Sequence, residues 1–425
     1  MKDELKGKKL LILAGAPVHC KVVQSAKEMG VHTIVTDYLN YEESPAKQIA
    51  DEYWNLNITQ VDEIVEKCKK EKVAGVLNFC IDPAQRPYQE ICEKLGFYCY
   101  GTKEQFLILT DKVLFKKFCQ KNDVDIIEEY SLNEVENDRV VYPLFIKPND
   151  SRGSRGQTIC YSKNQTKDAI ENALKESSDG KYIIEQYMCG KQDFTMTYLV
   201  KDGEPYLIRI GDRYLGTEED KLNKQCTCLV CPSKFSDLYF ETVHSKVCNF
   251  IRALGIKNGP VFMQGFVDGH KIRFYDPGLR FPGGEYEALL KKVTGADIMK
   301  MLIEFSLTGK MNQYNCLTQD LYKLNGCHTV QLPITAKPGI IKRFDGIDAI
   351  KKNKNVVSVF RRYNIDDEIP ATGDVRQRIC EIAFVVEKKE TVSDSVKKIQ
   401  DCIFVENEQN ENMLTSLVDA TLLTY

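Results

Sequence analysis

The sequence lacks a strong excess of charge of either sign and has no long uncharged apolar run. Its 425 residues carry a formal net charge of −3, with a pI near 6.1, so nucleic acid is not an expected partner. The start, "MKDELKGKKLLILAGAP", contains an apolar run too short to span a bilayer. It is more typical of a first buried strand than of a signal peptide. We therefore expect neither a membrane nor a nucleic-acid partner.

The cysteines show no disulfide framework. Sixteen of them are spread along a large chain without a leader, which favours reduced thiols in the cytoplasm. The tightest group, "QCTCLVC", holds Cys226, Cys228 and Cys231, but no fourth Cys or His follows at zinc-finger spacing. Its alternation fits the buried residues of a strand, and binding of a soft metal is the alternative.

Two glycine-rich nucleotide fingerprints are also absent. The loop after the first apolar run is "AGAPVH", without the G-x-G-x-x-G of dinucleotide-binding domains, which counts against a nicotinamide cofactor. The loop "KPNDSRGSRGQT", residues 147–158, lacks the G-K-[ST] of a P-loop.

Residues 8–100 alternate apolar runs with amphipathic segments. The runs "KLLILAG", "VHTIVTD" and "VAGVLNF" predict strands, and "HCKVVQSAKEMG", "VDEIVEKCKKEK" and "AQRPYQEICEKLG" predict helices. This alternation predicts a parallel sheet with helices on both faces. From about residue 106 the pattern changes to a helix capped by Thr110 or Asp111, followed by antiparallel-looking strands with a "KDGE" hairpin turn. The expected class is α/β (α+β), with domains at 1–105, 106–315 (a lid subdomain at about 140–190) and 325–425.

The loop "KPNDSRGSRGQT" combines glycines with polar donors. Glycines allow backbone N–H groups to approach an anion closely, and serine hydroxyls add donors. Lys147 ends the preceding apolar run, so its ammonium group could reach a bound phosphate. A solvated linker is the alternative interpretation.

A second segment, "YIIEQYMCGKQD", predicts a strand that runs into a loop. Glu185 could accept a hydrogen bond from the exocyclic amine of a purine, and Asp193 could accept from ribose hydroxyls. The alternative for Glu185 is a surface acid beside a buried strand.

The stretch "VFMQGFVDGHKIRFYDPGLR", residues 261–280, predicts a β-hairpin. With "DGH" as a three-residue loop, Gln264 pairs with Phe274 and Phe262 pairs with Asp276. Gln264 and Asp276 then lie on one face, offset by two residues, where their side chains can converge on one cation. A two-residue Asp-Gly turn would put them on opposite faces.

Arginines follow the predicted strands. Arg280 leads into "FPGGE", a glycine-bearing turn where the backbone can approach a ligand, and a surface salt bridge is the alternative. In "RIGDR", Arg209 and Arg213 could bind an acidic group of a substrate. Surface pairing with Asp212 or nearby acids explains them equally well.

Taken together, these segments resemble the ATP-grasp superfamily of carboxylate–amine ligases. The ordered set "TDK", "FIKPNDSRGSRG", "IIEQYMCGKQDF" and "MQGFVDGHKIRFYDPGLRFPGG" carries the resemblance over about residues 1–310. Residues 325–425, with "ITAKPGIIKRFDGIDAI", are similar to the C-terminal module of biotin-carboxylase-like and L-amino-acid-ligase-like members. The resemblance implies a Rossmann-like N-terminal domain, an ATP-grasp fold of two α+β subdomains that clasp ATP, and a small C-terminal α+β module.

The resemblance also implies a role for each matching position. Lys112 and Lys147 would hold the ATP phosphates. Glu185 and the backbone of Met188 would bind adenine, with Gln186 beside them, and Asp193 would bind ribose, where glutamate or histidine is more usual. Gln264 and Asp276 fall where relatives have two acids that bind Mg²⁺ (or Mn²⁺), Gly278 falls where they have an asparagine ligand, and Arg280 would steady an acyl phosphate. A loop over the triphosphate would be formed by Ser151, Gly153, Ser154, Arg155 and Gly156.

The implied activity is ATP-dependent ligation of a small-molecule carboxylate to an amine, with release of ADP and phosphate. Relatives are often dimers, so the resemblance allows a homodimer of this protein. Three alternatives also stay open: a carbamoyl-phosphate-synthase-like enzyme, a biotin-carboxylase-like enzyme, and an ATP-binding protein without ligase activity. The last arises because Gln264 and Gly278 offer no charge, so the hairpin supplies about one negative charge where relatives supply two.

Overall fold

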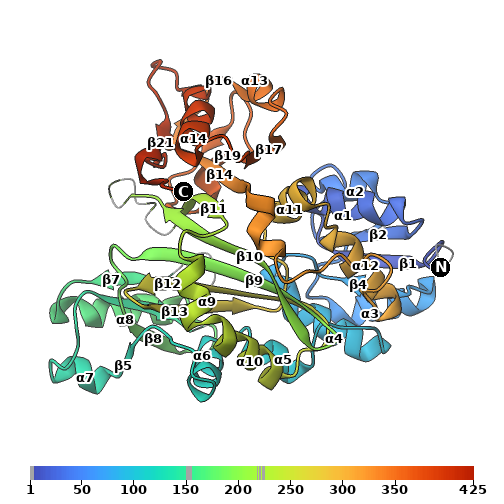
Figure 1. Ribbon diagram of the computed structural model, residues 1–425, viewed down its shortest axis with the longest axis horizontal. Helices are drawn as coiled ribbons and strands as arrows, with labels where there is room; N and C mark the ends of the chain where they lie inside the picture. Colours follow the sequence, from blue (N-terminus) through green and yellow to red (C-terminus); the bar gives the residue numbers. More distant parts are fainter. Residues whose placement is uncertain (1–3, 150–155, 218, 220–221, 223–224) are drawn as a thin grey trace.

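The computed structural model describes residues 4–149, 156–217, 219, 222 and 225–425. Figure 1 shows a parallel sheet near the N-terminus, a small sheet far from it, and a long antiparallel sheet that runs between them to the C-terminal region. Within the described residues, none of the helices combines the length and the apolar character that crossing a membrane requires.

The N-terminal region forms the predicted parallel sheet, with strand order β3-β2-β1-β4. Leu10 to Leu13 of β1 are fully buried, as expected for a strand whose sheet is covered on both faces. The predicted alternation is confirmed, although α2 and β3 were not predicted from the polar stretch that contains them. The elements are β1 (Lys9–Leu13), α1 (Pro17–Glu28), β2 (His32–Thr36), α2 (Pro45–Ile49), β3 (Glu52–Trp54), α3 (Val61–Glu71), β4 (Gly75–Leu77), η1 (Asp82–Ala84), α4 (Gln85–Leu95) and α5 (Lys103–Ile108).

A small antiparallel sheet, with strand order β5-β8-β6-β7, forms one wall of the site described below. It has its own apolar core, in which Leu144 and Ile146 pack against Ala169 and Ala173 of α8. Helix α6 precedes it and is capped by Asp111, whose carboxylate accepts from the N–H groups of two following residues. The elements are α6 (Lys112–Lys121), β5 (Glu129–Tyr130), α7 (Leu132–Glu136), β6 (Leu144–Pro148), β7 (Thr158–Cys160), η2 (Lys163–Gln165), α8 (Thr166–Lys175) and β8 (Tyr182–Gln186).

The long sheet follows the order β13-β12-β9-β10-β11-β14-β19-β17, with β21 paired to β14. It joins the region around the site to the C-terminal region. The predicted "KDGE" turn is confirmed, because Lys201 pairs with Glu204 across Asp202 and Gly203. Its strands are β9 (Gln192–Lys201), β10 (Glu204–Leu215), β11 (Cys226–Cys231), β12 (Gly259–Asp268), β13 (Lys271–Gly278), β14 (His328–Ala336), β17 (Val356–Arg361), β19 (Arg378–Val386) and β21 (Leu414–Thr415).

Helices and short strands cover this sheet. The segment predicted as one helix, "YFETVHSKVCNFIRALG", is two helices, because the backbone of Val243 leaves the helical conformation with φ −126°. The remaining elements are α9 (Ser236–Thr242), α10 (His244–Leu254), α11 (Tyr286–Thr294), α12 (Ile298–Thr308), η3 (Leu321–Gly326), β15 (Gly339–Ile340), β16 (Arg343–Asp345), α13 (Ile347–Lys351), β18 (Glu368–Ile369), η4 (Val375–Gln377), α14 (Val392–Asp401), β20 (Phe404–Glu406) and η5 (Ala420–Leu422).

The register of the β12–β13 hairpin differs from the prediction. The turn has two residues, Gly269 and His270, because Asp268 pairs with Lys271. A register shift follows, which leaves Tyr275 as an extra residue in β13. This bulge places Gln264 directly opposite Asp276 rather than opposite Phe274. The predicted pairings were therefore wrong, but the two side chains still share a face.

Candidate active site

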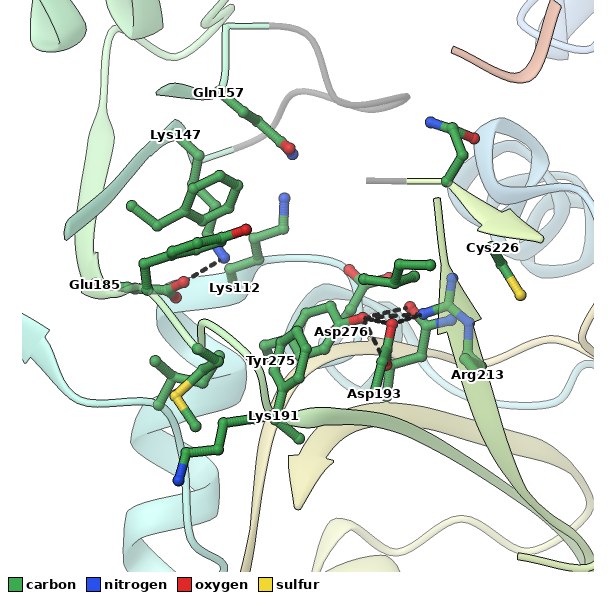
Figure 2. Close-up of a pocket in the computed structure, with 18 of the residues that line it drawn as sticks. Lys112, Lys147, Gln157, Glu185, Lys191, Asp193, Arg213, Cys226, Tyr275 and Asp276 are labelled. Atoms are coloured by element: carbon green, nitrogen blue, oxygen red, sulfur yellow. Dashed lines mark hydrogen bonds and ion pairs between the residues drawn. The ribbon is translucent and has the colours of Figure 1, made fainter. Parts of the chain in front are cut away.

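A cavity of about 940 Å³ lies between the small sheet and the long sheet. Figure 2 shows Lys112, Lys147 and Glu185 on one side of it and Asp276, Asp193 and Arg213 on the other. Ligand sites of enzymes are typically cavities of this size in which a few polar groups converge. Nine of the residues predicted from the sequence line it: Lys112, Lys147, Glu185, Gln186, Met188, Asp193, Gln264, Asp276 and Arg280.

A buried cluster of charges forms the wall made by the small sheet. The ammonium group of Lys147 lies 2.6 Å from Glu185, and the ammonium group of Lys116 contacts the other carboxylate oxygen of Glu185. All three side chains are almost fully buried. Glu185 is therefore not the surface acid of the alternative interpretation. Lys116, one turn after Lys112 on α6, was missed by sequence reasoning.

This cluster shifts the pKa of its members. Burial is the main cause that lowers the pKa of Lys147, to about 8; the ammonium groups of Lys116 and Lys112 act in the same direction, and Glu185 opposes them. Burial alone would raise the pKa of Glu185, but Lys147 and Lys116 lower it to about 2. Glu185 is thus ionised at neutral pH, and its negative charge keeps the ammonium groups of Lys147 and Lys116 at the cavity wall.

The segment after β8 lines the cavity. Gln186 and Tyr187 use their N–H groups within the fold, donating to Glu128 and Pro143 at 3.0 and 2.9 Å. The carbonyl of Met188 accepts from Lys191 at 3.2 Å. The N–H of Met188 has no acceptor among the described residues. An unpaired N–H in a cavity wall suits a hydrogen bond to a planar heterocycle.

Asp193 has a partner that the sequence analysis did not assign to it. It is almost fully buried, and one of its oxygens lies 2.6 Å from the guanidinium of Arg213. The hydroxyl of the bulged Tyr275 lies 3.3 Å from the other oxygen. Burial raises the pKa of Asp193 to about 6, although Arg213 acts in the opposite direction.

Arg209 and Arg213 do not form the surface pairs with Asp212 that were the alternative for the "RIGDR" segment. Asp212 pairs with neither arginine among the described residues; it is next to Arg213 on β10, and adjacent residues of a strand point to opposite faces. It instead accepts from Ser233, from the N–H of Lys234 and from Tyr425. Arg209 is buried at 3% exposure, so it is not a surface residue.

Gln264 and Asp276 form the part of the cavity predicted to bind a metal. The carboxylate of Asp276 forms no ion pair or hydrogen bond with another described residue. Burial raises its pKa, while Lys112 and Arg280 oppose the shift. The side-chain oxygen of Gln264 lies 3.3 Å from the hydroxyl of Tyr275.

Gln264 and Asp276 together offer too few oxygen ligands to bind a metal ion alone, so the ion would need further ligands such as water or phosphate oxygens. Nowhere in the described ranges do three His, Cys, Asp or Glu side chains gather in a way that would hold a metal. One carboxylate and one amide oxygen suit Mg²⁺ that keeps waters and phosphate oxygens. Gly278, where relatives have an asparagine, adds no donor and does not line the cavity.

Arg280 lies at the end of the hairpin; its guanidinium is largely buried, but it does form a salt bridge, with the half-exposed carboxylate of Asp82. Its guanidinium contacts Asp82 of η1 through Nε and through Nη2, the latter at 2.9 Å. It also stacks over Phe262, with 5.0 Å between the guanidinium carbon and the ring centroid. Asp82, which was missed, follows the end of β4, where ligands of parallel sheets usually bind.

The predicted phosphate loop is only partly described. Ser151, Gly153, Ser154 and Arg155 lie outside the described residues. Gly156 has φ +65°, and a Cβ there would lie 2.9 Å from atoms of Glu176 and Pro148, so glycine suits this position. Gly156 does not line the cavity.

The cysteine-rich segment is strand β11, as its alternation predicted. Cys228 and Cys231 are buried, and Cys226 is partly exposed at the cavity. All sixteen cysteines are free thiols.

Comparison with known proteins agrees with this geometry. Residues 111–314 match the family model described as "Carbamoyl-phosphate synthase L chain, ATP binding domain". This region contains most of the residues that line the cavity and is similar in sequence to the ATP-binding domains of that family. The resemblance predicted from the sequence is thereby confirmed.

Individual relatives cover more of the chain. A formate-dependent phosphoribosylglycinamide formyltransferase of Prochlorococcus marinus (strain NATL1A) is 26% identical over 61% of this chain and 67% of its own length. Two crystal structures share the fold. The L-amino acid ligase of Bacillus licheniformis has a TM-score of 0.75 at 15% identity, covering 95% of this chain and 99% of its own. A biotin carboxylase of Campylobacter jejuni has a TM-score of 0.75 at 17% identity, covering 98% and 94%. The predicted α/β ATP-grasp fold is confirmed.

Proposed function

We propose that this protein is an ATP-dependent ligase that joins the carboxylate of a small acid to an amine through an acyl phosphate. One observation carries the proposal: Lys147 and Asp276, which belong to different sheets, line the same cavity together with Lys112 and Arg280. Positive groups for phosphates, one unpaired carboxylate for a cation and one guanidinium for a reacting acid therefore surround a single space.

The nucleotide would lie along the small sheet. Lys112 and Lys147 would contact its phosphates, and the unpaired N–H of Met188 would contact adenine beside Glu185 and Gln186. Asp193 would accept from the ribose. Because Asp193 is already paired with Arg213, we expect its contribution to affinity to be small. The loop residues Ser151, Gly153, Ser154, Arg155 and Gly156 would cover the triphosphate.

Mg²⁺ would be held by Asp276 and Gln264 together with phosphate oxygens, and it would neutralise charge on the triphosphate. Mn²⁺ fits the same oxygen donors. Since the protein supplies one carboxylate, the ion would depend on the nucleotide for its remaining ligands. This supports a working site with weak affinity for metal alone.

In the proposed reaction a carboxylate oxygen of the acid attacks the γ-phosphate, and ADP leaves. An amine then attacks the acyl carbon, phosphate leaves, and the amine loses a proton. Lys147 and Lys112 offset the charge that moves onto ADP, and Arg280 stabilises the acyl phosphate and the tetrahedral oxyanion. The protein needs no nucleophile of its own, because its contribution is position and charge.

We infer domains at 1–105, 106–315 and 325–425, a cytoplasmic location consistent with sixteen free thiols, and a homodimer as one assembly to test. A biotin-carboxylase-like or carbamoyl-phosphate-synthase-like reaction is the second candidate, favoured by the likeness to the biotin carboxylase fold. Bicarbonate-dependent release of ADP without any amine would identify it.

The test is phosphate release by the purified protein with MgATP across a matrix of acids and amines. The proposal predicts release that needs both substrates and yields one amide. Tight binding of ATP with no release across the matrix would instead identify an ATP-binding protein without ligase activity.

A further inference from the structure

A second cavity of about 460 Å³ adjoins the first and has an unusual charge. The two cavities share several lining residues, among them Gln264, Arg280 and Arg378, so the second begins where the reacting carboxylate would lie. Among the described residues, five arginines line it: Arg209, Arg213, Arg280, Arg362 and Arg378. Two acids of the described ranges also line it, Glu285 and Glu381.

Most of these charges are already balanced. Arg213 pairs with Asp193, Arg280 pairs with Asp82, and Arg362 pairs with Glu381. Glu285 pairs with Lys21 at 2.5 Å. Arg209 and Arg378 remain, and neither forms an ion pair with a described residue.

Arg209 is the stronger anomaly. Its side chain is 3% exposed. One nitrogen, Nη2, donates to Gln331 at 3.3 Å, whereas Nε and Nη1 have no hydrogen-bond partner among the described residues. The side-chain nitrogen of Gln331 is unpaired within the same described part of the chain. Buried polar groups are almost always paired, and a buried cation without a counter-charge is costly.

Arg378 faces the same cavity from β19. It reaches Gln225 and the carbonyl of Cys226 through Nη2 at 3.5 and 3.4 Å, and its Nε has no partner in the ranges that the structure describes. Burial lowers its pKa, while Glu381 opposes the shift. Like Arg209, Arg378 therefore has no negatively charged partner in direct contact among the described residues, although a buried guanidinium favours one.

The third side of the cavity is the start of α1. Ala16, Pro17 and Val18 line it, and the helix has neither a side-chain cap nor an acidic residue in its first turn. The N-terminus of a helix carries partial positive charge and unpaired N–H groups. The helix thus adds to the positive field that the two arginines create.

One nearby acid does not cancel this field. Glu287 is buried and acts on Arg209 through space, but both of its oxygens lack partners and it does not line the cavity. It forms no ion pair with Arg209 within the part of the chain that the structure describes. Of the groups that line the cavity, Arg209, Arg378 and Gln331 are the ones with polar atoms left unpaired among the described residues.

We propose that this second cavity binds an anionic group of the acid substrate, a carboxylate or a phosphate, separate from the carboxylate that reacts. Guanidinium groups match both anions with paired hydrogen bonds. The inference rests on the proposed function for the reacting end, near Gln264 and Arg280. It adds the class of substrate: a small acid with a second negative group, held by Arg209, Arg378 and the amide of Gln331.

The first test compares matched acids. Dicarboxylic acids from malonate to adipate are measured against their monoamides, and phosphorylated hydroxy acids against the parent hydroxy acids. Binding is measured by calorimetry without ATP, and KM by phosphate release with MgATP and a panel of amines. We expect at least one charged acid to bind about tenfold or more tightly than its neutral partner. If the dicarboxylic acids show this preference, the bound group is a carboxylate; if the phosphorylated acids show it, the bound group is a phosphate.

The second test uses variants. Arg209→Gln and Arg378→Gln are each expected to remove most of that preference, and Arg209→Lys to restore part of it. Arg362→Gln is the matched control, because this arginine lines the same cavity but is balanced by Glu381. Arg378 is partly exposed, so its variant tests the idea even if Arg209→Gln does not fold.

The outcomes separate this inference from the ligase proposal. Charged acids that bind preferentially through Arg209 and Arg378, without any turnover, would defeat the ligase reaction but support the anion site. Turnover with no preference for a second charge, or a preference unchanged in both variants, would overturn the anion site and leave the ligase intact.

Discussion

Asp82 and Arg280 are 198 residues apart in the sequence and meet in a two-point ion pair at the edge of the cavity. Asp82 follows a strand of the parallel sheet, and Arg280 follows the hairpin of the long sheet. The pair therefore fixes the guanidinium with respect to both regions. We expect Asp82 to position Arg280 rather than to touch the reacting atoms.

Substitution of Asp82 tests that relationship. Asp82→Asn keeps the size of the side chain and removes its charge. Turnover is expected to fall about ten- to a hundredfold, because misplacing a catalytic group costs that much. The affinity for ATP, measured by calorimetry, should stay unchanged. A loss of ATP binding equal to the loss of turnover would show that Asp82 has another role.

Arg280 itself should act on the reaction and not on nucleotide binding. Arg280→Ala is expected to lower turnover about a hundred- to a thousandfold, the usual cost of removing a group that stabilises an oxyanion. Arg252→Ala, which removes an exposed arginine paired with Glu204, is the control. If ATP binding and turnover fall together, the assigned role of Arg280 is wrong.

The Mg²⁺ concentration that ATP binding requires should change when Gln264 is substituted. Gln264→Glu places a second carboxylate directly opposite Asp276, and the Mg²⁺ concentration needed for half-maximal ATP binding should fall on the order of tenfold. Asp276→Asn should raise it. An unchanged requirement in both variants would mean that the hairpin does not contact the metal.

Affinity for ATP should depend on pH through Lys147. Its ammonium is charged below a pKa of about 8, so ATP affinity should hold near neutral pH and fall as the pH rises through that value. The slope can reach about tenfold per pH unit. Lys147→Met should bind ATP weakly and lose this pH dependence. Equal slopes in the two proteins would assign the titration to another group.

Stability should depend on pH through Glu287. Burial raises its pKa to about 7, so between about pH 4 and 7 the folded protein holds a proton that the unfolded chain has lost. The wild type should therefore lose stability as the pH rises through this range. Glu287→Gln should gain up to about 3 kcal/mol relative to the wild type at about pH 8 and little at about pH 4. A difference independent of pH in denaturant unfolding would contradict the assignment.

The helices and strands were predicted more accurately from the sequence than the contacts between distant residues were. The periodicity of apolar residues was sufficient for β1, β2 and β4 with their helices, because a buried parallel sheet leaves a strong local pattern. Nine of the predicted residues line the cavity, because each motif that contains them carries its own chemistry. Lys116 could also have been found, since it lies four residues after Lys112 and thus on the same face of α6.

Other features had no local signal. The bulge at Tyr275 changes the hairpin register by one residue, and nothing in "IRFYDP" separates a bulged from a regular strand. The partners of Asp193 and Arg280 depend on how distant strands lie side by side. The charge of the second cavity depends on which arginines lack a counter-charge, and that follows only from all contacts together.

The central claim is that the cavity between the two sheets holds one nucleoside triphosphate. Equilibrium titration of MgATP into wild type, Lys147→Met and Lys181→Met tests it most directly, because Lys181 is a mostly exposed lysine of the same region. We predict saturable binding with one site per chain, weakened about tenfold or more by Lys147→Met and unchanged by Lys181→Met. No saturable binding, or equal affinity in all three proteins, would contradict the account.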